Sequence, residues 1–297
     1  MPAQSNGPPR LVIPQHQSVL EFAGGRYFKV AIVACAAAIA VYWWHDVPGA
    51  YLKPYGGTWL GYTLGTISAL LVLWLMLLGI RKRNYDSNLG SVQGWTSAHV
   101  YLGVALIIIA TLHCGFEFGW NIHTLAYALM VLVIGSGIFG VYAYVRYPQY
   151  MTANLSGETL ETMVFTMRDL EAKCARIVLD LPDEVGELVT ASFQRAESKS
   201  ALRGSFRRQL AGVDPAHPIR AARDRLLKAG PGFTAEQTRV LGHLVAEMTR
   251  TVVLNDRVRT DLRFRALMQL WLYFHVPLSF ALLGALIAHV ISVFYFW

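Results

Sequence analysis

Cysteine and charge are both scarce in this 297-residue sequence. The three cysteines, Cys35, Cys114 and Cys174, share no CxxC spacing, which excludes zinc ribbons, thioredoxin-like centres and cysteine-ligated iron–sulfur clusters. A CxxCH motif for covalent haem attachment is missing as well. Only 15% of the residues are charged, compared with about 25% in soluble domains, so the composition argues against a soluble cytoplasmic enzyme.

Long stretches contain no charged residue at all, and they lie at 30–45, 54–80, 87–116, 118–145 and 266–297. A helix needs about 20 apolar residues to cross a bilayer. The sequence therefore predicts an all-α integral membrane bundle of five transmembrane helices, at 28–44, 59–80, 94–116, 122–145 and 268–296. Helices buried in a soluble protein are the weaker alternative, because they keep a polar stripe that these stretches lack.

The basic residues lie almost entirely on one side of the predicted helices. Of the 26 lysines and arginines, only Lys53 falls on the opposite side. Because basic loops stay in the cytoplasm, we expect a cytoplasmic N-terminus, an external C-terminus and no cleavable signal peptide, in a bacterial inner membrane. The net charge of +7 then reflects topology, and no nucleic-acid partner is expected.

The predicted organisation has four parts. A cytoplasmic N-terminal segment occupies 1–27, transmembrane helices one to four lie within 28–146, a helical cytoplasmic insertion occupies 147–265, and helix five lies within 266–297. Apolar residues recur with helical spacing at 160–181 and 234–254 of the insertion, and Thr234 followed by Gln237 indicates a helix start. The insertion could dock a partner subunit or brace helices four and five.

A glycine-rich stretch at 135–140 matches the GxGxxG dinucleotide fingerprint. That fingerprint requires a strand–turn–helix junction, whereas this stretch lies inside a predicted membrane helix. We interpret the glycines as close helix packing or as clearance for a flat cofactor.

Four histidines lie inside predicted membrane helices in a repeated pattern. His99 and His113 are 14 residues apart on helix three, and His275 and His289 are 14 apart on helix five. Fourteen residues fall only about 40° short of four helical turns and span about 21 Å, so each pair shares a face at two depths. Histidine inside a membrane is costly and usually functional, although interhelical hydrogen bonding is the alternative role.

The surroundings of these histidines also repeat. Trp95-x3-His99-Val100 corresponds to Trp271-x3-His275-Val276, which indicates two equivalent walls of one binding space. Zinc and copper sites usually add thiolates or carboxylates, and Cys114, adjacent to His113, is expected to point elsewhere. Haem iron needs only two axial imidazoles. Gly103 and Gly284 could provide clearance for haem, and Arg81 and Arg146 could pair with its propionates or simply set the topology.

With these residues, the sequence resembles the dihaem b-type cytochrome membrane subunits, which hold two stacked haems by two histidines on each of two helices. The placement on helices three and five is most similar to the ferric reductase and NADPH oxidase transmembrane group. The general pattern is shared with respiratory cytochrome b and with the cytochrome subunits of hydrogenases and formate dehydrogenases. The resemblance excludes 147–265, and no flavin or nicotinamide domain follows helix five, so direct NADPH oxidation is not expected.

The resemblance implies two haem b groups ligated by His99, His113, His275 and His289, and the transfer of electrons between the membrane faces. Membrane lipid, quinone and a peripheral redox subunit are the expected partners. Two alternatives remain: a terminal metal or oxygen reductase, or a non-redox metal or haem transporter. Whether the chain is itself an enzyme stays open, and a cytochrome b subunit of an oxidoreductase complex is the leading interpretation.

The predicted topology also fixes how the ligands pair. Helices three and five both run outward, so we expect His99 with His275 at the inner level and His113 with His289 at the outer level. His45 and His123, with Asp46 and Glu117, fall on the outer side. They could form a quinol site there, although ordinary helix-end residues are the commoner explanation.

Overall fold

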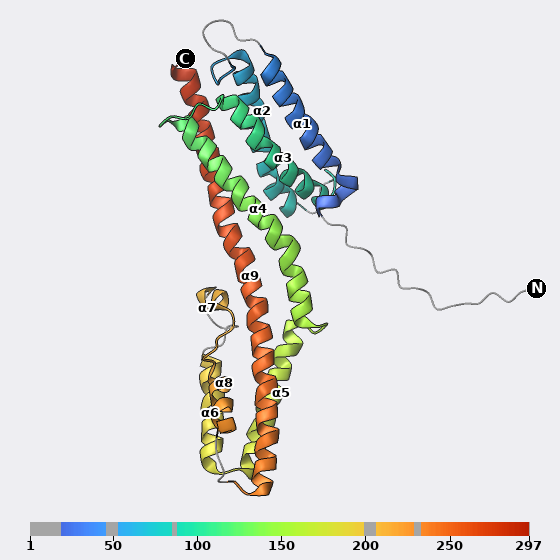
Figure 1. Cartoon of the computed structure of the whole chain (residues 1–297), viewed down its shortest axis with the longest axis vertical. Coiled ribbons are helices and arrows are strands. Elements are labelled where there is room, and N and C mark those ends of the chain that lie inside the picture. The colour runs from blue at the N-terminus through green and yellow to red at the C-terminus, as the bar shows by residue number, and fades with distance from the viewer. Residues whose placement is uncertain (1–18, 46–52, 85–87, 199–205, 229–232, 297) are drawn as a thin grey trace, which may run out of the picture. The chain divides into compact units, whose positions relative to one another are not determined.

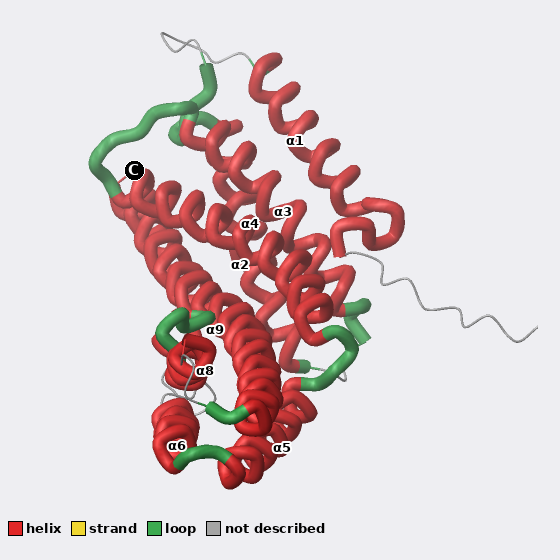
Figure 2. Tube along the Cα trace, turned by 60° about the horizontal axis from the view of Figure 1, so that its bottom comes forward, coloured by secondary structure: helices red, strands yellow, loops and turns green. Residues whose placement is uncertain are grey.

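A computed structural model describes residues 19–45, 53–84, 88–198, 206–228 and 233–296, and every regular element in these ranges is a helix (Figures 1 and 2). Most of the predicted N-terminal segment, together with Asp46, lies outside the described residues. The first four long helices are α1 (Arg26–Trp44), α2 (Trp59–Arg83), α3 (Val92–Cys114) and α4 (Ile122–Leu155), and the short η1 (Val19–Gly25) precedes them. The remaining elements are α5 (Leu160–Ile177), η2 (Val178–Asp180), α6 (Asp183–Ser198), α7 (Phe206–Ala211), α8 (Pro218–Lys228) and α9 (Ala235–Phe296).

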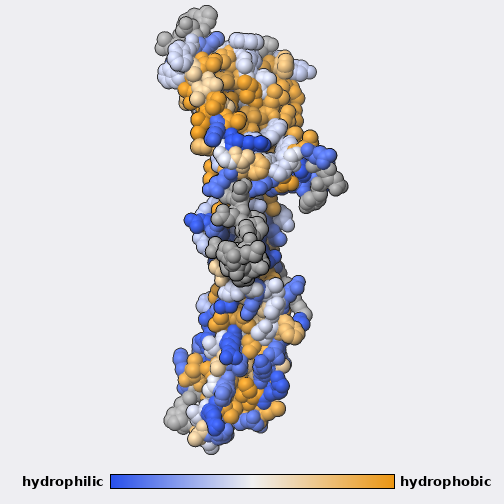
Figure 3. Space-filling model, turned by 90° about the vertical axis from the view of Figure 1, so that its right-hand side faces the viewer, coloured by the Kyte–Doolittle hydropathy of each residue, from blue (hydrophilic) through white to orange (hydrophobic). Residues whose placement is uncertain are grey.

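Five of the described helices are long and apolar enough to cross a membrane, and they match the five predicted spans, except that the third ends at Cys114 and not at residue 116. Their outward side chains are large and hydrophobic: Trp44, Leu70 and Phe280 are all more than half exposed. Figure 3 shows hydrophobic residues dominating the visible surface over α1–α3. These apolar helices indicate an integral membrane protein in contact with lipid.

Two of these helices continue well past the predicted spans. We expected helix four to end near 145, but α4 runs to Leu155 with the exposed Pro148 inside it. Helix five was predicted to begin near 268, whereas α9 begins at Ala235 and is continuous for 62 residues, with Pro277 inside it. The lack of charge decides which residues can cross the bilayer. Outside the bilayer a helix continues wherever its side chains pack on neighbouring elements.

The chain divides into two compact units. Unit 1 comprises Met1–Ile138 and His275–Trp297, and unit 2 comprises Phe139–Phe274. In unit 1, α2, α3, α4 and α9 meet around a buried cluster of Val72, Leu106, Met130 and Leu282. All four motif histidines belong to unit 1.

Unit 2 has its own hydrophobic core, which joins α5, α6, α8 and the first half of α9. Its most buried members include Cys174, Val189, Leu244 and Met248. The predicted helix start at Thr234 is confirmed: the Gln237 amide donates to Thr234 Oγ1 at 3.2 Å, and the Thr234 amide donates to Gln237 Oε1 at 3.0 Å. This reciprocal capping satisfies two amides that the first turn of α9 leaves without helical partners.

Candidate cofactor site

His99 is held against α2 by its Nδ1 nitrogen. Nδ1 lies 3.0 Å from the carbonyl oxygen of Leu75, and since a carbonyl can only accept, Nδ1–H is the donor. In the neutral ring the proton is therefore on Nδ1, which leaves the lone pair on Nε2. One turn earlier, Trp95 stacks on Trp74 of α2 with ring centroids 5.0 Å apart.

His275 is held against α4 in a comparable way. Its Nδ1 lies 2.8 Å from Ser136 Oγ, and the Ser136 hydroxyl donates to the Val133 carbonyl at 2.7 Å. Because that hydroxyl has one hydrogen, Oγ accepts from Nδ1–H, and Nε2 of His275 again carries the lone pair. Gly137 also approaches this ring: a Cβ built there would lie 3.5 Å from His275 Cε1.

The two copies of the W-x3-H motif thus have corresponding neighbours. Trp95 and His99 contact α2, whereas Trp271 packs against Gly140 and His275 against Ser136, both on α4. A Cβ at Gly140 would overlap the Trp271 indole, so this glycine is required for the close approach of the ring. The glycines of 135–140 lie within a helix, where Gly137 and Gly140 serve the close packing that the sequence indicated and Gly135 has open space beside it.

His113 stands at the other end of α3. Its Nδ1–H donates to the Gly61 carbonyl at 2.7 Å, so its Nε2 also carries the lone pair. A Cβ at Gly65 would lie 2.6 Å from His113 Cε1, so the absence of a side chain at Gly65 makes room for the ring. Three of the four motif histidines therefore have a fixed tautomer, with the proton on Nδ1 and the lone pair on Nε2.

The structure brings His113 and His289 together, at the level that the topology predicts to be the outer one. Their ring centroids are 6.2 Å apart. Two imidazoles that bind one metal from opposite sides, with metal–nitrogen distances of about 2 Å, need a similar spacing. At the other level, His99 and His275 are close enough for electrostatic interaction. The rings are therefore grouped as the sequence grouped them, and their pairing as ligands stays a prediction.

A third histidine joins the outer pair. The His123 centroid lies 5.2 Å from that of His113 and 4.9 Å from that of His289, and the ligand atoms of the three rings all lie within 4.8 Å of one another. Sequence reasoning placed His123 only on the outer side, since its distance along the chain from the motif histidines gives no periodic signal. The remaining members of the expected quinol group, His45 and Glu117, belong to no such cluster among the described residues.

We had expected Cys114 to point away from the histidines, but it contacts one of them. Its Sγ lies 3.3 Å from His123 Nε2, and the residue is 3% exposed. The reason is the turn that follows α3. Gly115 has a φ of 59°, and a Cβ there would lie 2.8 Å from the Pro54 carbonyl oxygen, so glycine permits the tight reversal. The start of α4 then returns to the end of α3.

The other predicted cofactor residues have different surroundings. Gly103 is buried, and a Cβ built there would meet no atom within 4 Å, which indicates open space beside α3. Gly284 has equally open space, but it faces the exterior. Arg81 is buried and donates to the backbone carbonyls of Asn84 at 2.7 Å and Gly90 at 2.6 Å, so it closes the connection between α2 and α3. Arg146 is exposed and belongs to unit 2.

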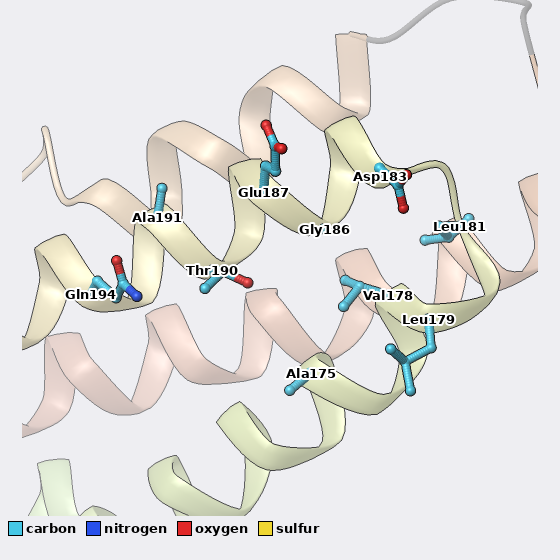
Figure 4. Close-up of a pocket in the computed structure, with 10 residues that line it drawn as sticks. All are labelled: Ala175, Val178, Leu179, Leu181, Asp183, Gly186, Glu187, Thr190, Ala191 and Gln194. Carbon is cyan, nitrogen blue, oxygen red and sulfur yellow. The ribbon is translucent and has the colours of Figure 1, made fainter.

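Each unit also contains a cavity. In unit 1, α1 and α3 line a half-open cavity of about 340 Å³ with largely apolar walls that include Tyr42, Thr111 and Leu112. In unit 2, a pocket of about 670 Å³ lies between α6 and the end of α5 with η2 (Figure 4). This second pocket is lined by residues that include Leu179, Leu181, Asp183 and Glu187. No histidine lines it.

Comparisons of the chain with protein-family models, curated proteins and solved structures find no match. Its function must therefore be inferred from its own residues.

Proposed function

We propose that this chain is a membrane electron-transfer subunit, a dihaem cytochrome b in which His99 and His275 would hold one haem and His113 and His289 the other. A bound haem would supply a one-electron carrier at each level. The observation that carries the proposal is the pairing of histidines on α3 and α9 at two depths, with Nδ1 held by a neighbouring oxygen in three of the four rings.

The residues around the histidines fit this role. Hydrogen bonds from Nδ1 to Leu75, Gly61 and Ser136 hold the rings in fixed orientations and make Nε2 a stronger donor to a metal. Gly65 leaves space for the His113 ring, and the space beside the buried Gly103 is open. The predicted spans that carry the four histidines contain no charged residue, and low local polarity is one of the factors that set a haem potential.

Quinone is the proposed membrane-soluble partner. The cavity between α1 and α3 has apolar walls and polar groups at Tyr42 and Thr111, a combination that suits a hydrophobic ring with carbonyl oxygens. It is lined by Leu112, the neighbour of the proposed ligand His113. A second electron-transfer partner, a peripheral redox protein, would complete the path.

The experiment is haem analysis of the purified full-length chain. We expect two haem b per chain and a reduced-minus-oxidised spectrum with two b-type components. His99→Ala and His275→Ala should alter one component, and His113→Ala and His289→Ala the other. His243→Ala, in the exposed part of α9, is the matched control and should alter neither.

Two results would contradict the proposal in different ways. Purified chain without haem after expression with ample haem supply would exclude a cytochrome and leave a histidine-based transporter as the alternative. A shared spectral component for His99→Ala and His289→Ala would retain the haems but reverse the pairing.

A further inference from the structure

We infer that the outer histidine level is also a three-imidazole metal site, in which His113, His123 and His289 bind one divalent transition-metal ion. Such an ion and the outer haem of the proposed function would exclude each other. The inference does not depend on a haem at the inner level, because none of the three ligands belongs to that level.

The geometry of the three rings supports a single ion. Their centroids form a compact triangle with sides of 6.2, 5.2 and 4.9 Å. Their ligand atoms already lie within 4.8 Å of one another. Metal–nitrogen bonds of about 2.0–2.1 Å bring ligand nitrogens to roughly 3.5 Å from one another, so rotations of the side chains are enough to close the site.

The position of His123 explains why ion and haem compete. Its ring is nearly equidistant from His113 and His289, and it therefore lies close to the plane midway between them. A porphyrin whose iron joins His113 to His289 needs that plane, so His123 has to turn aside before haem can bind. An ion held by all three rings prevents this movement.

The ligand chemistry selects the class of ion. Three neutral imidazoles suit zinc, copper or nickel, whereas calcium and magnesium require oxygen ligands. A fourth position stays available for water or another small ligand, as in three-histidine zinc sites. Cys114 Sγ lies 3.3 Å from His123 Nε2. Cys114 is therefore placed to orient the His123 ring and not to bind the ion.

Zinc is the probe for the test. Full-length chain prepared under haem limitation is loaded with Zn²⁺, dialysed and analysed by mass spectrometry of the metal. We expect one zinc per chain. Zinc affinity should fall by more than about tenfold in His123→Ala, because even second-shell substitutions weaken metal sites by about 10–100-fold. His45→Ala, at the end of α1, is the matched control and should retain the affinity of the unaltered chain.

X-ray absorption at the zinc edge of the unaltered chain tests the same site without a variant. The expected spectrum has a first shell of nitrogens at about 2.0–2.1 Å from the zinc, with three imidazole rings as the ligands. The inference would be overturned by an unchanged zinc affinity in His123→Ala. It would also be overturned by an absorption spectrum that shows only two imidazole ligands or a sulfur ligand. If His123→Ala fails to fold, the absorption spectrum of the unaltered chain decides.

Competition with haem separates this inference from the proposed function. Haemin added to haem-free chain should yield two haems per chain without zinc and one with zinc, and a zinc chelator should restore the second. Uptake of two haems despite bound zinc would overturn the exclusion. Failure of the chain to take up any haem would count against the proposed function, while the zinc stoichiometry would still decide the metal site.

Discussion

His217 is a buried histidine that differs from the motif histidines in its hydrogen bonding. It lies in unit 2, is 2% exposed, and its Nδ1 has no hydrogen-bond partner among the described residues. Burial, reinforced by the positive charge of Arg259, lowers the pKa of His217 to about 4. Three of the four motif histidines differ because neighbouring carbonyls and a hydroxyl accept their Nδ1–H groups.

This buried imidazole predicts a pH dependence of stability. The pKa of His217 is about 6.5 when unfolded and about 4 when folded, so below pH 6.5 the unfolded chain takes up a proton that the folded chain does not. Stability should be fully present above pH 6.5 and fall by a few kcal/mol as the pH decreases toward 4. Thermal melting followed by circular dichroism checks this, with the exposed His243→Gln as control.

The His217→Gln variant separates this residue from other titrating groups. A glutamine cannot titrate, so its melting temperature should depend less on pH between 6.5 and 4 than that of the unaltered chain. Equal pH dependence in both proteins would assign the effect to other groups.

Only some of the candidate site could be predicted at the residue scale. The motif histidines have a periodic signal, since a spacing of 14 residues on a helix fixes a common face. His123 and Cys114 have none, because they meet through the turn at Gly115 and not through a shared helix. The hydrogen bonds from Arg81 to the carbonyls of Asn84 and Gly90 could not be predicted either, because nothing in the sequence specifies the path of that loop.

At the scale of elements, lack of charge identified the membrane helices but not their full length. The spans could be predicted because a charged residue inside the bilayer is costly. The extension of α4 to Leu155 could not, because it depends on tertiary contacts such as the bond from Asn154 Nδ2 to the Arg257 carbonyl at 2.7 Å. The same applies to the first half of α9, which Leu244 and Met248 hold in the core of unit 2.

Two glycines of α4 should respond oppositely to alanine. A Cβ at Gly140 overlaps the Trp271 ring, whereas a Cβ at Gly135 meets no atom within 4 Å. Replacing a helical glycine normally stabilises by about 0.5–1 kcal/mol, but overpacking costs about 1–3 kcal/mol. We expect Gly135→Ala to raise the melting temperature in detergent and Gly140→Ala to lower it.

Melting of the two variants in the same detergent provides the comparison. Shifts of the same sign would mean that the Trp271 indole can move away from α4 at little cost, and the close approach at Gly140 would then not be required.

At the scale of the whole molecule, the motif histidines and the core of the insertion belong to different units. Unit 1 contains every proposed ligand, and unit 2 contains the cluster of α5, α6, α8 and α9. The Asn154–Arg257 contact holds α4 and α9 together where the polar part of the chain begins and ends. The sites should therefore survive removal of the rest of the insertion.

Replacing residues 158–254 with a short glycine–serine linker tests this separation. The Asn154–Arg257 contact is kept, so haem and zinc content per chain should match those of the full-length protein. If the insertion docks a redox partner, electron exchange with that partner should be lost while reduction by dithionite persists. Loss of both cofactors in the shortened chain would instead identify the insertion as a brace.

The positions of Pro277 and of the glycines beside Ser136 have a mechanical consequence. A helix bends most easily where proline or a glycine–serine pair interrupts its hydrogen bonding or packing. Pro277 follows His275 by two residues on α9, and Gly135 and Gly137 flank Ser136 on α4. Each helix therefore has a compliant point beside the hydrogen bond between Ser136 and His275. Bending of either helix at that point would change the orientation of the His275 imidazole.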